Sequence, residues 1–504
     1  MGMALSLIIY NRDSMPICWT LAVRSRPLLL AACVFLVAPC ARPAEGADPR
    51  AVADSAALSS SLWDAWPHGV AVSPFALKHE GMRAELAALL ARHAELFRIA
   101  EEGVSAEGRR IPLVVLGNGP TTVLLWSQMH GDEPTATSAL LDVLEHLGRT
   151  RKTPETERLL SRLTLAIIPM LNPDGAERTR RTNAQGIDIN RDALRLETPE
   201  GRFLKSVRDR LKPSIGYNLH NHSPSLTAGK QGPQVAISLL SVPYDEAFTE
   251  NEGRLATKRL AVVVQRLLQP YAKDRVARYD MDYTARAFGD SLTRWGTATL
   301  LIESGGFFGP DEANTLVRLN FVALLGTLHV LADGSLAAVD AKAYDAIPLN
   351  TRDRLFDLLL RNARVVSGAG LPPYLADVGM NLPPARASFA GSSGRGGRGG
   401  VFEVGDLSDF LGKKEIDLTG RLLAVAPPGG EEGWKRTLAG LVSRGRATAA
   451  GVLTLSEADL GAESKAWIGN VPALAPGFGG DFLVLQPEGE GRFRLERRIS
   501  SVEP

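Results

Sequence analysis

The chain has 504 residues, of which 45% are hydrophobic and 22% are charged, so it is long enough to bury one large core and a second, smaller one. Its formal net charge of +1 gives no general electrostatic reason to expect nucleic acid or an anionic membrane as the main partner. The composition therefore predicts a globular protein and sets polyanion binding aside.

The first 46 residues have the pattern of an export signal. Arg24 and Arg26 precede an apolar run over 28–37, which is too short for a mature transmembrane helix and fits the core of a signal peptide. Ala44 and Gly46 are the small residues that favour cleavage after residue 46. A buried N-terminal helix is the alternative interpretation.

All three cysteines of the chain, Cys18, Cys33 and Cys40, lie within this signal. Cleavage before Cys40 would leave a lipid-anchored protein, but Pro39 directly before it argues against lipidation. A mature chain without cysteine needs neither disulfides nor a reducing compartment. We therefore expect an exported protein, periplasmic or extracellular, with no stable membrane span after the signal is removed.

The chain after the signal divides into a lead-in and an α/β region. Residues 47–110 form the lead-in, with a helical stretch over 82–99. Apolar runs typical of strands then follow at 111–116, 122–127, 163–170, 214–219 and 297–302, separated by helix-period segments such as 135–147 and 254–268. This alternation predicts an α/β domain over 111–340, with a mixed central sheet flanked by helices.

Side chains capable of metal chemistry follow two of these strands, at the sheet edge where open α/β sheets bind ligands. His130 and Glu133 follow the strand at 122–127, and their spacing of three lets an imidazole and a carboxylate share one cation. Alone this pair is a weak signal, because a histidine cap beside a solvated acid has the same spacing. His220, which follows 214–219, would complete two histidines and one carboxylate, with a fourth position open as catalytic zinc requires.

Two further residues bear on this site. Glu303 ends the strand at 297–302 and precedes two glycines, so it is a candidate general base, although an ordinary strand-end acid is the alternative. His222 competes with His220 as a metal ligand but lies farther from the strand, so His220 is favoured.

Arginines cluster between the strands at 163–170 and 214–219. Arg178, Arg180 and Arg181 precede the segment 186–192, which contains Asn190 and Arg191. Near a metal, such groups can donate paired hydrogen bonds to a substrate carboxylate and to a developing oxyanion. Without that context, a solvated basic face explains them equally well.

Taken together, the motifs between about residues 112 and 331 resemble the zinc carboxypeptidases of the carboxypeptidase A type, which have a phosphorylase/hydrolase-like α/β fold. The matching motifs in chain order are His130-x-x-Glu133, Asn172-Pro173-Asp174-Gly175, Arg181 with Asn183, Asp188-x-Asn190-Arg191, Leu219-His220 and Ile302-Glu303. The resemblance implies a metallocarboxypeptidase that hydrolyses C-terminal peptide bonds with one Zn2+ per chain.

The resemblance also implies a role for each matched residue. His130, Glu133 and His220 would hold the zinc, with Asp188 supporting a ligand histidine; Asn190 and Arg191 would grip the terminal carboxylate, Arg181 would stabilise the oxyanion, and Glu303 would pass a proton from water to the leaving amine. The family's substrate-contacting tyrosine is missing from 284–291, and Tyr283 is the nearest substitute. Asp132 stands where digestive members have an arginine, so contacts with the substrate must differ.

Residues 345–504 have short strand-like runs at 363–366 and 482–485, and a glycine-rich segment at 391–400 that is typical of a flexible loop. Parts of 360–379 and 475–485 resemble the opening and closing strands of the β-sandwich of amidohydrolases of the D-aminoacylase and dihydroorotase type. The stretch 427–471 is too short for the barrel of those enzymes and has no histidine. We therefore expect an accessory β-sandwich domain without catalysis of its own.

The sequence thus predicts an exported zinc carboxypeptidase that acts on a peptide or peptide-like substrate with a free carboxylate. Two alternatives stay open. One is a zinc amidase or deacylase acting on a cell-wall or small acylated substrate, and the other is a catalytically silent metal-binding protein on the same scaffold. Glu303 discriminates between catalysis and mere binding, because a metal-binding module does not need a general base.

Overall fold

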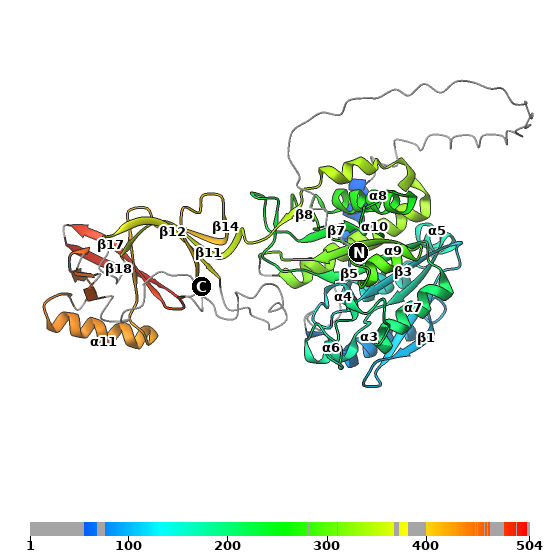
Figure 1. Cartoon of the computed structure of the whole chain (residues 1–504), viewed down its shortest axis with the longest axis horizontal. Helices are drawn as coiled ribbons and strands as arrows, with labels where there is room; N and C mark the ends of the chain where they lie inside the picture. The colour runs from blue at the N-terminus through cyan, green and yellow to red at the C-terminus, as the bar shows by residue number, and fades with distance from the viewer. Residues whose placement is uncertain are drawn as a thin grey trace, which may run out of the picture. The chain divides into compact units, whose positions relative to one another are not determined.

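The computed structural model describes residues 55–67, 76–280, 282–309, 311–366, 372–381, 400–448, 450, 452–457, 459–460, 462–463, 478–489 and 491–500 (Figure 1). The predicted export signal, residues 1–46, lies outside the described residues, and so do residues 391–399 of the glycine-rich segment.

An eight-stranded mixed sheet forms the centre of the α/β region. In spatial order its strands are β1 (Arg98–Val104), β2 (Arg110–Leu116), β4 (Leu163–Ile168), β3 (Thr121–Ser127), β5 (Ile215–Asn221), β9 (Ala298–Ser304), β7 (Ile237–Ser241) and β8 (Val276–Arg278). Strands β4, β3, β5 and β9 are mutually parallel, whereas β1 pairs antiparallel with β2, β2 with β4, and β7 with β9. The predicted mixed sheet is confirmed, and the carboxyl ends of its four central strands meet at one edge.

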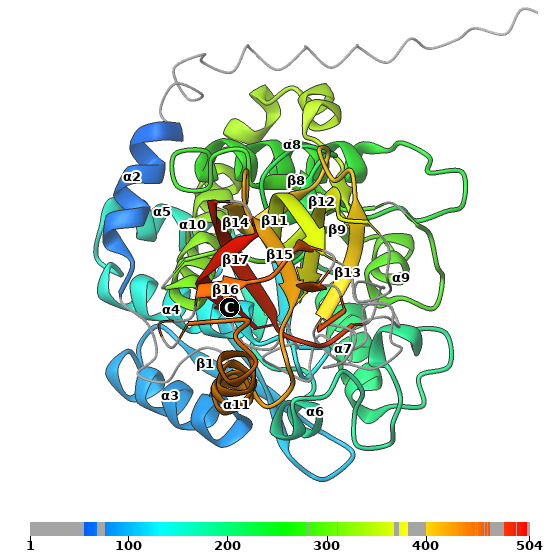
Figure 2. The same ribbon diagram turned by 90° about the vertical axis from the view of Figure 1, so that its left-hand side faces the viewer.

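Helices cover both faces of this sheet. Alternate residues of β3 point to opposite sides: Val123 and Leu125 pack into one core cluster, and Leu124 and Trp126 into the other. The first cluster includes side chains of α2 (Ser55–Ala65), α3 (His79–Arg92), α4 (Thr135–Arg149), α5 (Pro154–Arg162), α8 (Glu252–Leu268) and α10 (Glu312–Asp333), and the second includes those of α7 (Pro199–Leu211) and α9 (Phe288–Arg294). Figure 2 shows α2, α4, α5 and α10 on one side of the strands and α7 and α9 on the other.

Helix α10 is long and apolar enough to cross a membrane by length and composition, but 72% of its apolar window is buried inside the protein. Phe321, Leu324 and Leu328 are fully buried members of the first core cluster. The apolar character of α10 is therefore that of a core helix.

The shorter elements complete the α/β region. They are α6 (Pro173–Arg178), β6 (Thr227–Ala228), β10 (Asn350–Thr351) and the 3-10 helices η2 (Ile189–Arg191), η3 (Ser335–Ala338) and η4 (Ala341–Ala346). β10 pairs antiparallel with β6, so the chain up to residue 351 belongs to this region by its pairing.

One boundary expected from the sequence is wrong. The helical stretch predicted over 82–99 ends at Arg92, because α3 stops there and Arg98 begins β1. Ile99 pairs with Val114 of β2 in an antiparallel register. The tertiary pairing with β2 thus overrides the local helical pattern.

The C-terminal region forms a second eight-stranded sheet. Its strands in order are β13 (Gly400–Gly405), β12 (Tyr374–Asn381), β11 (Leu355–Val366), β15 (Leu422–Val425), β17 (Phe482–Gly489), β18 (Arg492–Ile499) and β16 (Val452–Thr454), with β14 (Leu411–Asp417) paired to β11. Leu423 and Val425 pack into one cluster, whereas Leu422 and Ala424 pack into another that contains Trp434 of α11 (Gly430–Ser443). The prediction of a second, β-rich region is confirmed.

Candidate metal centre

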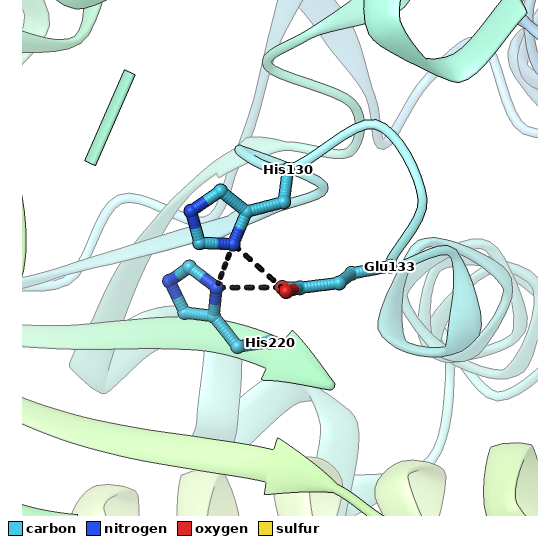
Figure 3. A group of neighbouring side chains, drawn as sticks. All are labelled: His130, Glu133 and His220. Carbon is cyan, nitrogen blue, oxygen red and sulfur yellow. Dashed lines mark hydrogen bonds and ion pairs between the residues drawn. The ribbon is translucent and has the colours of Figure 1, made fainter. Parts of the chain in front are cut away.

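Three buried side chains converge at the carboxyl ends of β3 and β5, where His220 is the penultimate residue of β5 and His130 and Glu133 follow β3 (Figure 3). His130 Nδ1 lies 2.8 Å from Glu133 Oε1, and His220 Nδ1 lies 2.7 Å from Glu133 Oε2. The two Nδ1 atoms are 3.1 Å apart. One potential ligand atom from each residue of this triad lies within 4.8 Å of those from the other two, so one cation can contact all three residues. The structure therefore brings together the three metal ligands that the sequence predicts.

The electrostatics of the triad favour a positive charge among its members. Burial tends to raise the pKa of Glu133, but the positive charges of His130 and His220 outweigh it and hold that pKa well below its usual value. Burial lowers the pKa of His130, but the Glu133 charge and the Asp188 hydrogen bond more than offset this and raise it to about 9. The site thus stabilises an anionic carboxylate facing a cation, and a metal ion can replace the proton on the imidazole.

Asp188 orients the first histidine. Its Oδ1 accepts a hydrogen bond from His130 Nε2 at 3.1 Å, so the Nδ1 lone pair of His130 is left for a metal. Arg181 donates from Nε to Asp188 Oδ2 at 3.0 Å and from Nη1 to Glu133 Oε1 at 3.3 Å. Asp188 therefore has the supporting contact expected of it, and Arg181 lies beside the triad with its side chain 43% exposed.

A tight loop contact fixes the position of His130. Gln128, two residues earlier, has a φ of 52°, and its side chain donates to Gly131 O at 2.9 Å. Gly131 lies so close to the turn at 172–175 that a Cβ atom there would be 2.1 Å from the carbonyl carbon of Gly175. Asn172 strengthens the contact, because its backbone N–H donates to Gln128 O at 3.0 Å. The turn motif found in the sequence thus serves as a backbone support for the metal loop.

Glu303 ends β9 next to the triad. It is the register partner of His220 on the adjacent parallel strand, so the two side chains extend from the same face of the sheet. Glu303 is buried, and its Oε2 atom has no hydrogen-bond partner among the described residues. Burial, reinforced by the charge of Glu133, raises the pKa of Glu303 to about 8. A carboxylate with an unused oxygen in this position is able to accept a proton.

Asn190 and Arg191 lie on η2, close to Asp188. The side-chain oxygen of Asn190 accepts from Phe288 N at 2.9 Å, which leaves its amide group as a donor. Arg191 is exposed and donates from Nη1 to Asn190 O at 2.7 Å. The next residue, Asp192, is buried and accepts hydrogen bonds from both the backbone and the hydroxyl of Thr198, the N-cap of α7. η2 is therefore held by the start of α7.

Two tyrosines lie upstream of Glu303. Tyr283 is half-buried, and none of the contacts described for the triad involves it. Tyr279, which the sequence analysis did not single out, has its ring 6.1 Å from that of His222 at an interplanar angle of 28°. Burial raises the pKa of Tyr279 to about 12, and the charge of Glu303 adds to the rise. Its position directly after β8 is the same strand-end signal that identified His220 and Glu303.

His222 is not part of the triad. Its Nδ1 lies 2.7 Å from Ser223 O and its Nε2 lies 3.0 Å from Ser238 Oγ, so both ring nitrogens are occupied. Burial lowers its pKa to about 4, which keeps the ring neutral. The structure thus brings His220, and not His222, to Glu133.

The donor set of the triad suits zinc. Two imidazole nitrogens and one carboxylate oxygen are the ligands that catalytic Zn2+ sites use most often, and all three residues are buried. The carboxylate that positions His130 is also typical of zinc sites. The residues present therefore fit one Zn2+ ion per chain.

Comparison with known proteins agrees with this donor set. Residues 82–208 match the family model described as zinc carboxypeptidase. The chain is 29% identical over 172 residues to Probable carboxypeptidase 2 of Arthroderma benhamiae, covering 31% of this chain and 32% of that protein. It is 33% identical over 202 residues to Carboxypeptidase E of Caenorhabditis elegans, covering 34% of this chain and 40% of that protein. The chain therefore spans about a third of the length of these curated relatives.

Solved structures of similar proteins include a metallo-carboxypeptidase from Pseudomonas aeruginosa in complex with (2-guanidinoethylmercapto)succinic acid. It is 21% identical, with a TM-score of 0.41, and the match covers 50% of this chain and 69% of that one. A metallo-carboxypeptidase from Burkholderia cenocepacia is 18% identical, with the same TM-score, and covers 51% of this chain and 69% of its own.

Proposed function

We propose that the protein is a zinc metallocarboxypeptidase that hydrolyses the C-terminal peptide bond of its substrate, starting from the match of residues 82–208 to the zinc carboxypeptidase family model. One observation carries the proposal: Glu303 and the triad member His220 are register partners on adjacent strands, which puts a proton acceptor beside a metal site. The substrate is a peptide or a peptide-like molecule with a free carboxylate.

The chain's own residues account for the steps. His130, Glu133 and His220 would hold the zinc ion, which when bound would supply a Lewis acid for the scissile carbonyl and for the attacking water. The free oxygen of Glu303 takes a proton from the attacking water and returns it to the leaving amine. Arg181, beside the triad, donates hydrogen bonds to the negative charge that develops on the carbonyl oxygen.

We assign the orientation of the substrate to two residues of η2. The amide group of Asn190 and the exposed guanidinium of Arg191 offer donors that can fork onto the terminal carboxylate. Tyr283 is retained as a further contact with the substrate. These assignments make the enzyme an exopeptidase, because they require a free carboxylate next to the scissile bond.

The decisive experiment compares the wild-type protein with Glu303→Gln in a zinc analysis and a turnover assay on blocked peptides with free C-termini. We expect the variant to keep one zinc per chain and to lose turnover by about a thousandfold, since general-base catalysis contributes roughly a hundredfold to ten-thousandfold. Glu155→Gln, an exposed acid on α5, is the matched control and should keep both zinc and turnover.

Each other result points to a different function. Equal turnover in the wild type and Glu303→Gln removes Glu303 from the mechanism. Zinc without turnover on any peptide favours the silent metal-binding protein, and turnover only on acylated or cell-wall compounds favours the amidase or deacylase. Absence of stoichiometric zinc from the wild type refutes the metal centre itself.

We also propose that the protein is exported and that its mature chain has three parts: the lead-in 47–110, the catalytic domain 111–340 and an accessory β-domain within 345–504. The basic and apolar pattern of the first 46 residues supports export. N-terminal sequencing of the protein from the extracytoplasmic fraction tests this, with Ala47 expected as the first residue.

A further inference from the structure

Arg352 is held near the loop that follows the metal ligand His220, although it comes after the residues 111–340 assigned to the catalytic domain. It comes directly after β10, whose Thr351 pairs with Thr227 of β6. β6 lies in the loop that follows β5, the strand that carries His220. Gly229 in that loop donates its backbone N–H to Leu349 O at 2.8 Å, so the chain leading to Arg352 is held on both sides of the pairing.

The side chain of Arg352 lies close to the segment that carries Tyr279. Its ion-pair partner Asp280 directly follows Tyr279, whose ring stacks on that of His222. His222 lies two residues after the metal ligand His220. Strand pairing thus holds Arg352 on the side of the site formed by Tyr279 and His222.

Arg352 is held loosely, in contrast to the arginine at the triad. Its Nε is 3.9 Å from Asp280 Oδ2, and the two side chains are 52% and 49% exposed. Arg181, by comparison, donates to Asp188 at 3.0 Å and also contacts Glu133. A guanidinium has five N–H donors, and the partners described for Arg352 do not use them all. It can therefore take a further anion with both arms of its fork.

We propose that Arg352 binds the side-chain carboxylate of an acidic substrate residue next to the scissile bond, so that the enzyme prefers peptides with glutamate or aspartate at or just before the C-terminus. The inference rests on the proposed function, in which Asn190 and Arg191 already bind the terminal carboxylate of the substrate. Arg352 then serves a second carboxylate and is a specificity-determining residue.

The test uses the full-length zinc protein and pairs of blocked peptides that differ only by glutamate or glutamine, first at the last position and then at the one before it. The two side chains have nearly the same shape, so kcat/KM for the pair isolates the charge. We expect the wild type to prefer glutamate at one of these positions by about tenfold or more, as is typical of a hydrogen bond to a charged group. In Arg352→Gln this ratio should fall to about one, and in Arg352→Lys to an intermediate value.

Arg354→Gln is the matched control. Arg354 lies two residues farther along the chain and pairs with Asp409 at 2.5 Å, so the loss of its charge should leave the ratio unchanged. The proposal is overturned if the wild type shows no preference for glutamate at either position, or if the preference survives in Arg352→Gln. It is also overturned if the variant loses all substrates equally and its pH profile shifts, because Arg352 would then act on Glu303 alone.

A binding measurement separates failure of this inference from failure of the proposed function. Calorimetry with zinc-loaded Glu303→Gln follows the same peptide pairs without turnover. Tighter binding of the glutamate peptide that disappears in Glu303→Gln/Arg352→Gln supports the anion site even if the wild type hydrolyses no peptide. Equal binding of both peptides to the two proteins refutes it even if the wild type is an active carboxypeptidase.

Discussion

At the residue scale, the proposal that the enzyme acts at a C-terminus depends on Arg191. Its exposed guanidinium lies beside Asn190 and near Asp188, which supports the triad. Burial raises the pKa of Asp188, but His130, Arg181 and Arg191 outweigh burial and lower it. Among the described residues, the side chain of Arg191 makes one hydrogen bond, to the backbone oxygen of Asn190. This fits a role toward substrate rather than toward the fold.

We therefore expect Arg191→Gln to reduce kcat/KM for peptides with a free C-terminal carboxylate by roughly tenfold to a hundredfold, since charged hydrogen bonds contribute about 1.5 to 3 kcal/mol. The same peptides with amidated C-termini should lose little. Arg195→Gln, an exposed arginine four residues along, is the control. Equal losses on free and amidated peptides would contradict the exopeptidase assignment.

Asp142 is a buried acid remote from the chemistry. It lies on α4 and accepts a hydrogen bond from Trp66 Nε1 at 2.8 Å. Burial raises its pKa from 3.8 to about 7, and the Trp66 hydrogen bond only partly opposes the rise. Because the folded protein binds this proton more tightly than the unfolded chain, the stabilisation is fully present below about pH 4 and is lost as the pH rises to about 7.

Asp142→Asn keeps an acceptor for Trp66 and cannot ionise. We expect it to be more stable than the wild type at pH 8, by on the order of 2 to 4 kcal/mol in the free energy of unfolding, and to differ less at pH 5. Urea unfolding at the two pH values measures this, with Glu155→Gln as a surface control. A variant no more stable than the wild type at pH 8 would mean that burial does not raise the pKa of Asp142 in the folded protein.

At the scale of elements, the loop after β3 and the turn before α6 act as one unit. Gly131 and Gly175 meet backbone to backbone, and Asn172 bonds to the loop through both its backbone and its side chain. His130 and Glu133 lie on either side of this contact. Their geometry therefore depends on a close approach that only glycine permits.

Gly131→Ala should move the loop, because its Cβ would lie 2.1 Å from a backbone carbon that cannot rotate away. We expect zinc affinity to fall by more than tenfold and stability by roughly 1 to 3 kcal/mol. Competition with a chromophoric chelator gives the affinity. Gly81→Ala on α3, whose nearest contact is the end of the Leu77 side chain at 3.4 Å, is the control. Unchanged zinc affinity in Gly131→Ala would show that the loop tolerates the shift.

At the scale of the whole molecule, the metal centre links β3, α4 and β5 at the edge of the central sheet. Two buried histidines and a buried glutamate meet there, and their ligand atoms are placed so that one cation can bind all three. Zinc that binds the folded protein alone stabilises it by mass action.

Removing zinc with a chelator should therefore lower the melting temperature of the α/β region as well as abolish turnover. At free zinc about a thousand times Kd the stabilisation is roughly 4 kcal/mol, which corresponds to a shift on the order of 10 °C. Differential scanning calorimetry with and without chelator measures it. His220→Ala should show no zinc-dependent shift, and a shift that persists in this variant would place the bound zinc elsewhere.

The sequence by itself determined the periodic elements and the triad. Apolar runs followed by His130, His220 and Glu303 predicted buried strands with functional side chains at their carboxyl ends. Parallel strands are buried, and their carboxyl ends lie at one edge of the sheet. Each of these predictions depends only on the residues of one strand and those that follow it, so it could be made without the tertiary structure. It also indicated the second, β-rich region after residue 345.

Only the tertiary structure decided which residues meet across the sheet. In the structure, Arg98 and Ile99 pair with β2, where the local pattern predicted a helix. Both ring nitrogens of His222 form hydrogen bonds with serines, so His222 is not a metal ligand. The tertiary structure also brought Arg352 to Asp280, the neighbour of Tyr279, although 71 residues of chain lie between Asp280 and Arg352. The pairing of β10 with β6 closes that distance, and contacts of such long sequence separation leave no periodic signal in the chain.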